Sequence, residues 1–423
     1  MNEVVIVGGG WAGCAAAMTA VNNGMSVTLL ERTDLLLGTG LVGGIMRNNG
    51  RYTAAEEMIA MGGGGLFAVI ERNLKHKNIR FPGHEHVDLY DVGKIQGQVR
   101  TFLESLGIKI KFERRISSLV KEGDTITGVK DQNNKLYKGD AFIDATGTAG
   151  PVANCTKYGN GCAMCILRCP SFGGRISLTA LAGIGEMIGQ KGDGSIGSMS
   201  GSCKLLKESL APWIIERLDK EGVVIIPLPD EVMEDHLDIK CCQQYALREF
   251  RQNLILLDTG HAKMMTPYYS VRKLRTVPGF ENVRYEDPYA GGRGNSMRFF
   301  AMAPRDDTLK VKGAENLFCA GEKAGLLVGH TEAIVTGVLA GYNCASYVKK
   351  APLLILPREL ASGDAIAYVR EEMETEEGMK KKYTFSGAGY FKRMEERGLY
   401  SVDADEIRRK VERLGLSNVF GED

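Results

Sequence analysis

The glycine pattern near the start of the chain constrains the fold more than any other feature. Residues 4–7 are Val-Val-Ile-Val, and this β-branched run predicts a buried parallel strand. Gly8, Gly10 and Gly13 follow it with the G-x-G-x-x-G spacing. Small side chains over residues 14–21 predict a helix that lies close to the sheet. This order of strand, glycine turn and helix predicts a Rossmann-type dinucleotide site.

A second strand is expected over residues 26–30, and it ends on an acidic residue, Glu31. In such a unit the first glycine allows a tight turn, the second lets the backbone approach a pyrophosphate, and the third lets helix and strand pack. The phosphates lie at the helix N-terminus, where free N–H groups attract anions, and the carboxylate accepts from ribose hydroxyls. The predicted contacts are Gly8, Gly10, Trp11, Ala12, Gly13, Glu31 and Arg32.

Length and composition describe an ordinary globular chain with room for two or three structural units. Of 423 residues, 44% are hydrophobic and 25% are charged. The net charge of +1 argues against a protein that coats nucleic acid. Residues 324–348 are weakly charged but rich in glycine, so we expect a loop and helix there rather than a membrane span. We expect no signal peptide, a cytoplasmic location and no membrane partner.

Three later segments bear on the choice between FAD and NAD. Residues 37–44 form a glycine-rich loop, and residues 141–147 read as a buried strand that ends in a glycine turn. Residues 316–322 form another strand that runs into a glycine–acid step. Together these segments resemble the flavoprotein group that includes GidA (MnmG) and the folate-dependent tRNA methyltransferase TrmFO. The first 150 residues are also similar to FAD-dependent dehydrogenases in general.

The resemblance implies FAD as the cofactor. It covers both ends of the chain well, and it covers residues 151–266 poorly. In that group the late glycine–acid step reaches the FAD ribitol, and the next helix N-terminus points at the flavin N1–C2 edge, where it stabilises negative charge. The FAD contacts expected from these segments are Gly43, Ala145, Thr146, Gly147, Gly321, Glu322, Gly329, His330 and Thr331.

The sequence therefore predicts an α/β fold built on one discontinuous FAD-binding domain. Residues 1–150 and 267–355 are expected to form this Rossmann-type domain, in which a small β-sheet crosses the parallel sheet. Residues 151–266 are expected to be an inserted cysteine-rich substrate region of the α+β type, and residues 356–423 a helical C-terminal region. The crossing sheet is expected from strands near residues 108–112 and 125–129.

Ten cysteines in a chain expected in the cytoplasm indicate thiols, metal ligands or redox groups rather than a disulfide scaffold. Cys162, Cys165 and Cys169 have the spacing of a bacterial ferredoxin run that lacks its leading cysteine, and Cys155 is the candidate fourth ligand. Three interpretations stay open. The four residues bind an iron–sulfur cluster or another metal; Cys162 and Cys165 form a redox dithiol that exchanges electrons with the flavin; or the thiols are buried without chemistry.

A second cysteine feature is the adjacent pair Cys241 and Cys242. A cysteine in a comparable region takes part in catalysis in the TrmFO-like group, so the resemblance implies a catalytic role for one of the pair. The alternative is a thiol at a helix start without chemistry. The same group has a nucleophilic cysteine in the early loop near the flavin, where residues 40–47 hold none. No side chain there replaces a thiolate, which counts against RNA methylation by the same mechanism.

Three functional hypotheses follow. The first is an FAD-dependent oxidoreductase that passes a hydride or electrons between reduced flavin and a small substrate or a cysteine or metal redox centre, with NAD(P)H as a transient reductant. The second is folate- and FAD-dependent uridine methylation or another tRNA modification. The third is a non-catalytic electron-transfer flavoprotein subunit. The absent early cysteine and the near-neutral charge favour the first over the second. The expected partner is a small molecule or an electron carrier, with RNA less favoured, and a homo-oligomer is compatible with each hypothesis.

Overall fold

The centre of the molecule is a five-stranded parallel sheet in the order β17-β10-β1-β2-β6. The computed structural model describes residues 2–147, 168–196, 202–238, 243–266, 269–286 and 299–421. The five strands are β1 (Glu3–Val7), β2 (Ser26–Leu30), β6 (Lys109–Lys111), β10 (Ala141–Asp144) and β17 (Leu317–Cys319). From β1 the chain first moves to one side, through β2 to β6, and then returns to the other side at β10. The carboxyl end of β1 is therefore the switch point at which such sheets bind ligands.

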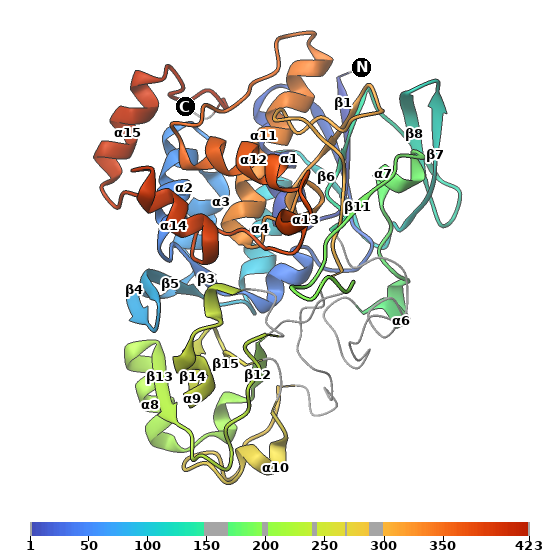
Figure 1. Ribbon diagram of the computed structural model, residues 1–423. Coiled ribbons are helices and arrows are strands. Elements are labelled where there is room, and N and C mark those ends of the chain that lie inside the picture. Colours follow the sequence, from blue (N-terminus) through green and yellow to red (C-terminus); the bar gives the residue numbers. More distant parts are fainter. Residues whose placement is uncertain are drawn as a thin grey trace.

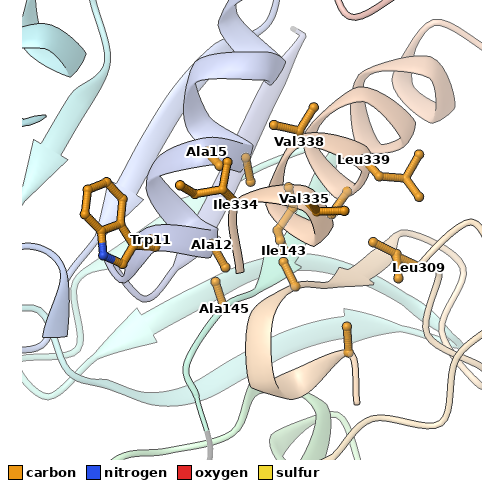
Figure 2. Close-up of a cluster of buried hydrophobic side chains, with 14 of the residues drawn as sticks. Trp11, Ala12, Ala15, Ile143, Ala145, Leu309, Ile334, Val335, Val338 and Leu339 are labelled. Carbon is orange, nitrogen blue, oxygen red and sulfur yellow. The ribbon is translucent and has the colours of Figure 1, made fainter. Parts of the chain in front are cut away.

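Two helices from opposite ends of the sequence pack on this sheet with their backbones in contact. They are α1 (Trp11–Asn22) and α11 (His330–Val348). A Cβ at Gly337 would lie 2.3 Å from the carbonyl oxygen of Ala12, and one at Gly341 would lie 2.4 Å from that of Ala16. Figure 2 shows the buried side chains of the two helices meeting above Ile143 of β10. This close approach fixes the N-terminus of α11 over the carboxyl ends of the strands.

Two small antiparallel sheets accompany the parallel sheet, in the orders β3-β5-β4 and β7-β8-β9. The expectation for residues 108–112 was wrong, because β6 joins the parallel sheet as its edge strand beside β2. The residues 125–129, from which the small sheet was also expected, lie in β8 of the β7-β8-β9 sheet. Between β2 and β10 the chain forms, besides β6, the strands of these two sheets and the helices that connect them. They are η1 (Gly38–Val42), β3 (Ile45–Met46), α2 (Gly50–Ala60), α3 (Gly65–Glu71), β4 (Leu74–Phe81), β5 (His84–Tyr90), α4 (Ile95–Ser105), β7 (Ile116–Glu122), β8 (Thr125–Asp131) and β9 (Leu136–Lys138).

A second, four-stranded antiparallel sheet in the order β12-β15-β14-β13 lies apart from the parallel sheet, at the bottom of Figure 1. One face packs against α8 through the buried Ile214 and Leu218. The other face packs Ile255 and Leu257 with residues of β4 and β5, so that it is turned toward the dinucleotide-binding part. The elements are β12 (Cys203–Leu205), α8 (Pro212–Glu221), β13 (Val223–Pro227), α9 (Arg248–Gln252), β14 (Asn253–Asp258), β15 (Ala262–Met264) and α10 (Val271–Leu274).

The C-terminal part has four helices, which lie at the left and centre of Figure 1. They are α12 (Ala361–Glu372), α13 (Glu376–Met379), α14 (Ala388–Glu396) and α15 (Ala404–Arg413). The buried carboxylate of Glu57 in α2 accepts hydrogen bonds from the Ala361 and Ser362 N–H groups at 2.7 and 2.8 Å, and thus caps α12.

The remaining short elements connect these units. They are α6 (Cys169–Phe172), α7 (Leu178–Leu181), β11 (Met187–Ile188), η2 (Lys207–Ser209), η3 (Gln243–Tyr245), β16 (Ala301–Met302) and η4 (Gly321–Lys323). Over the described ranges, no helix has both the length and the apolar character needed to cross a bilayer. The α/β architecture, with its parallel sheet, antiparallel second sheet and helical C-terminal part, confirms the predicted fold class.

Candidate functional site

Two adjoining pockets form a long cleft across the carboxyl ends of the parallel strands. The smaller is lined by Leu30, Glu31 and Arg32 at the end of β2 and by Ile116 of β7. The larger runs from α1 to the N-terminus of α11 and to β15. Residues that line both pockets are Gly10, Ala145 and Arg175. The cleft thus passes the N-terminus of α1 near its middle, which is the arrangement that an extended dinucleotide requires.

The three motif glycines have different surroundings. Gly8 has φ +106°, and a Cβ there would lie 2.2 Å from the Ala145 carbonyl oxygen, so the turn needs glycine. A Cβ at Gly13 would lie 1.9 Å from the Gly8 carbonyl oxygen, so α1 contacts the turn directly. At Gly10 a Cβ would meet no atom within 4 Å. Gly10 therefore borders open space, where a pyrophosphate can approach the backbone.

The N-terminus of α1 fits an anionic group. The helix has no side-chain N-cap and no acidic residue in its first turn, so its first N–H groups are available to a ligand. The indole Nε1 of Trp11, which lines the cleft, is buried without a hydrogen-bond partner. Burial, followed by the nearby guanidinium of Arg175, lowers the pKa of Arg32. A pyrophosphate would offset the mutual repulsion of these guanidinium groups.

Two acidic residues stabilise the loops around this anion site by accepting hydrogen bonds from them. The Glu31 oxygens accept hydrogen bonds from the Gly9 N–H at 2.8 Å and the Thr33 N–H at 2.7 Å, so its carboxylate holds the glycine turn. Contact between Glu31 and a ribose stays a prediction. The buried Asp144 accepts from the Thr146 hydroxyl at 2.7 Å and from the Thr179 N–H at 2.8 Å. It therefore fixes the turn over residues 145–147, a role that the sequence did not indicate.

At the far end of the larger pocket, three aromatic side chains meet the N-terminus of α11. The Tyr90 hydroxyl lies 3.0 Å from Nδ1 of His330, and the Trp11 and His330 rings are 6.0 Å apart. Gly43 leaves room for the imidazole, because a Cβ there would lie 1.6 Å from His330 Cε1. Trp11 and His330 line this end of the cleft and Tyr90 lies buried behind His330, so aromatic side chains are available to contact a planar ring system such as an isoalloxazine.

A buried ion pair lies behind this pocket, and it was not predicted from the sequence. Nε of Arg51 in α2 lies 3.1 Å from Oε1 of Glu332 in the first turn of α11. Arg51 also donates to the Val328 carbonyl at 3.2 Å, and Glu332 accepts from the Phe385 N–H at 2.9 Å. The pair links the α11 N-terminus to the C-terminal region. No local pattern signals a contact between residues so far apart in sequence.

Most of the predicted cofactor residues come together along this cleft. Those that line it are Gly8, Gly10, Trp11, Ala12, Glu31, Arg32, Gly43, Ala145, Thr146, Gly147, Gly321, Glu322, Gly329 and His330. Gly13 instead packs under the turn, and the Thr331 hydroxyl is buried against Met46 Sδ at 3.8 Å. The assignment of all these residues as ligand contacts remains a prediction.

The predicted cysteine sites lie almost entirely outside the described residues. This holds for Cys155, Cys162, Cys165, Cys241 and Cys242. Cys169, at the start of α6, is a half-buried free thiol. Within the described ranges, no group of three or more His, Cys, Asp or Glu side chains is arranged to hold a metal ion.

Three of the buried cysteines in the described ranges are unsuited to thiol chemistry. Cys14, Cys319 and Cys344 are free and buried. Burial raises the pKa of each, in Cys319 to about 12, so their reactive thiolate forms are suppressed near neutral pH.

Comparison with known proteins gives a consistent set of relatives. The family model described as "Glucose inhibited division protein A" matches residues 3–210 and 257–352. The "tRNA uridine 5-carboxymethylaminomethyl modification enzyme MnmG" of Salinibacter ruber is 22% identical over 429 aligned residues, which cover 85% of this chain and 61% of that protein. The enzyme of the same name from Thermodesulfovibrio yellowstonii is 38% identical over 98 residues, 22% of this chain and 15% of that protein.

Two further matches extend this picture. The "Methylenetetrahydrofolate--tRNA-(uracil-5-)-methyltransferase TrmFO" of Dictyoglomus thermophilum is 34% identical over 98 residues, 23% of this chain and 22% of that protein. The chain thus spans less than two thirds of the length of each of these three curated relatives. The solved structure of Aquifex aeolicus GidA in its form II crystal superposes with a TM-score of 0.65 at 16% identity, over 97% of this chain and 76% of that chain. That superposition shows a shared fold.

Proposed function

Since the chain belongs to the glucose inhibited division protein A family, we propose that it is an FAD-dependent enzyme that modifies a uridine of tRNA. The observation that carries the proposal is where the family match falls. The matched residues 3–210 and 257–352 include both sides of the cleft, from the α1 turn to the α11 N-terminus. The curated relatives of this chain are named as enzymes that act on a uridine or uracil of tRNA.

The sequence alone favoured an oxidoreductase that acts on a small substrate. The present proposal is instead the second hypothesis from the sequence, a tRNA modification. The near-neutral net charge of +1 was one argument against RNA, but a net charge does not report how charges are distributed. The general expectation of a flavin-dependent enzyme is retained. A transient reduction of the flavin by NAD(P)H stays an untested prediction, and a homo-oligomer stays compatible with the proposal.

Different residues along the cleft would hold the pyrophosphate, the flavin ring and the substrate. FAD, when bound, supplies hydride or electron transfer at its ring system. The α1 N-terminus and Arg175 would hold the pyrophosphate, and the α11 N-terminus would favour negative charge on the ring edge beside it. Tyr90 orients His330 at that edge. Ser202, which precedes β12, and Lys263 of β15 line the same pocket, where a substrate base would enter.

The loop that leads into this pocket also limits the chemistry that we propose. Residues 37–47 contain no cysteine, so no thiolate from this loop attacks the base. Any catalytic thiol must come from elsewhere, and Cys241 or Cys242 remains the predicted candidate. The proposal is therefore a uridine modification that does not use a cysteine of the early loop.

The test compares tRNA from a strain lacking the gene with tRNA from the same strain complemented by wild-type protein. We expect nucleoside mass spectrometry to show one modified uridine that is lost on deletion and restored on complementation. Gly10→Val, which fills the open space beside the α1 turn, should not restore it. The purified wild type should show flavin absorption bands and bind a tRNA transcript at low salt, where phosphate contacts are strongest. Unchanged uridine nucleosides, with no tRNA binding by the FAD-loaded protein, would refute the proposal.

A further inference from the structure

The larger pocket is lined by a buried polar side chain whose hydrogen-bonding groups are unused. Gln244 of η3 lines this pocket and is only 5% exposed. Within the part of the chain that the structure describes, its side-chain amide makes no hydrogen bond. That amide offers both N–H donors and a carbonyl acceptor. Because a buried amide without a partner costs free energy, a ligand that pairs with it would be bound favourably.

The backbone of Gln244 is fixed by a chain of hydrogen bonds. Its carbonyl accepts from Nε2 of His84 at 3.2 Å, and Nδ1 of His84 accepts from the Asn48 amide at 3.1 Å. Burial, helped by the charge of Arg51, lowers the pKa of His84 to about 3, so the ring is neutral and has one donor and one acceptor. Asn48 in turn accepts from Arg51 at 3.2 Å, and Arg51 pairs with Glu332 at the α11 N-terminus. The position of Gln244 is therefore tied to the flavin end of the cleft.

The side chain of Gln244 is packed at its base and has apolar neighbours in the pocket. A Cβ at Gly387 would lie 2.3 Å from Cβ of Gln244, so a glycine at that position makes room for the side chain. The adjacent Tyr245 belongs to one apolar cluster with Ile45 and Met265, and all three line the pocket. A few polar groups placed among apolar side chains are what fixes the orientation of a ligand in such pockets.

The amide fits the edge of a planar ring in which an N–H group adjoins a carbonyl group. Its oxygen can accept from the ring N–H while its own N–H donates to the ring carbonyl, which gives a bidentate contact. The two rings that the proposed function brings to this cleft, uracil and the isoalloxazine, share such an edge, a cyclic imide with an N–H between two carbonyl groups. We infer that Gln244 binds the imide edge of a pyrimidinedione ring in the larger pocket. This inference rests on the proposed function for the identity of the ring.

Methylation of the imide nitrogen tests the contact for each ring. Uridine and 3-methyluridine are titrated into the FAD-loaded protein by saturation-transfer NMR, and FAD and 3-methyl-FAD into the FAD-free protein by flavin fluorescence. For the ring that contacts Gln244, we expect the methylated compound to bind the wild type at least about tenfold more weakly, because the amide oxygen is then buried without a donor. In Gln244→Leu, this ratio of the two Kd values should fall to about threefold or less.

The ratio of Kd values separates recognition from a structural role. A side chain kept for packing alone would change the Kd of both compounds alike, so the ratio would stay the same. Gln98→Leu, at an exposed position of α4, is the matched control. Gln244→Leu should fold, because His84 contacts the backbone of Gln244 rather than its side chain. Since leucine removes an unpartnered amide, the melting temperature without FAD should be no lower than that of the wild type.

The two titrations also identify the ring. A fall of the uridine ratio in Gln244→Leu assigns the site to the substrate base, and a fall of the FAD ratio assigns it to the flavin. Ratios below about threefold in the wild type, or ratios that Gln244→Leu leaves unchanged, would overturn the inference if they are found for both rings. A fall of either ratio in a protein that leaves tRNA unmodified would keep the imide site and refute the proposed function. Full tRNA modification by Gln244→Leu, with both ratios unchanged, would refute only the imide site.

Discussion

Single residues of the first turn carry distinct requirements that the G-x-G-x-x-G spacing does not distinguish. Gly13 is needed for packing, since a Cβ would lie 1.9 Å from a backbone oxygen, whereas Gly10 borders open space. We expect Gly13→Ala to lower the free energy of unfolding of the FAD-free protein by about 1–3 kcal/mol, as overpacking does. Gly10→Ala should leave that stability unchanged but weaken FAD binding, because its methyl group enters the pyrophosphate space. Urea unfolding and flavin titration of both variants test this, and equal stability losses would contradict it.

Asp258 gives a residue-scale prediction in pH. Burial acts to raise the pKa of its carboxyl, but the hydrogen bond from His76 and the ammonium groups of Lys207 and Lys75 outweigh burial and hold the pKa below its ordinary value. Such a carboxyl stabilises the fold above its unfolded pKa of roughly 3.9, and this contribution is lost as the pH falls through the folded pKa.

We therefore expect Asp258→Asn to lower the free energy of unfolding by about 2–4 kcal/mol at pH 7, since its basic partners lose a buried counter-charge. The difference from the wild type should shrink as the pH falls below about 4. Denaturant titrations at several pH values measure it. Asp230→Asn, at an exposed position near the same sheet, is the control, and a difference independent of pH would be the contrary result.

Among the elements, the contact between α1 and α11 positions the flavin end of the cleft. An alanine in a helix interior is normally more stable than glycine by about 0.5–1 kcal/mol, but at Gly337 a Cβ would lie 2.3 Å from the Ala12 carbonyl oxygen. The clash outweighs the propensity, so we expect Gly337→Ala to lower the melting temperature and weaken FAD binding. In α14, a Cβ at Gly389 would meet no atom within 4 Å, so Gly389→Ala should raise the melting temperature slightly. A rise in both variants would show that the helices can separate without cost.

The elements also show where sequence information ends. The β1–α1–β2 unit was predictable because its strand run, glycine spacing and small-residue helix are all local. The edge strand β6 was placed in the wrong sheet, because a short strand has the same pattern in either sheet. The Arg51–Glu332 pair joins positions 281 residues apart and leaves no local signal. The position of Lys204 in β12 opposite Lys263 in β15 depends on strand register, which spacing along the chain does not fix.

For the whole molecule, the C-terminal helices share the main hydrophobic core through side chains such as Ile366, Tyr390 and Val411, and buried polar contacts add to this attachment. The Glu57 carboxylate caps α12, and Glu332 accepts from the Phe385 N–H. We expect Glu57→Gln to weaken this attachment by about 1–2 kcal/mol, because the amide offers one acceptor oxygen instead of two. Amide hydrogen exchange over residues 361–413 should then quicken by roughly 5–30-fold, while the parallel sheet stays protected. Faster exchange throughout the chain would mean that the C-terminal helices do not open as a separate unit.

The pairing of β10 with β17 has a consequence for the order of events during synthesis. Asp144 lies opposite Cys319 in this pair, and α11 follows β17 along the chain. At roughly 5–20 residues per second, the ribosome makes the second strand about 9–35 s after the first. Until then the nascent β10 presents an open sheet edge and an unfinished cofactor cleft. FAD therefore can act as a late folding ligand, and the cellular yield of this protein should depend on riboflavin supply during translation.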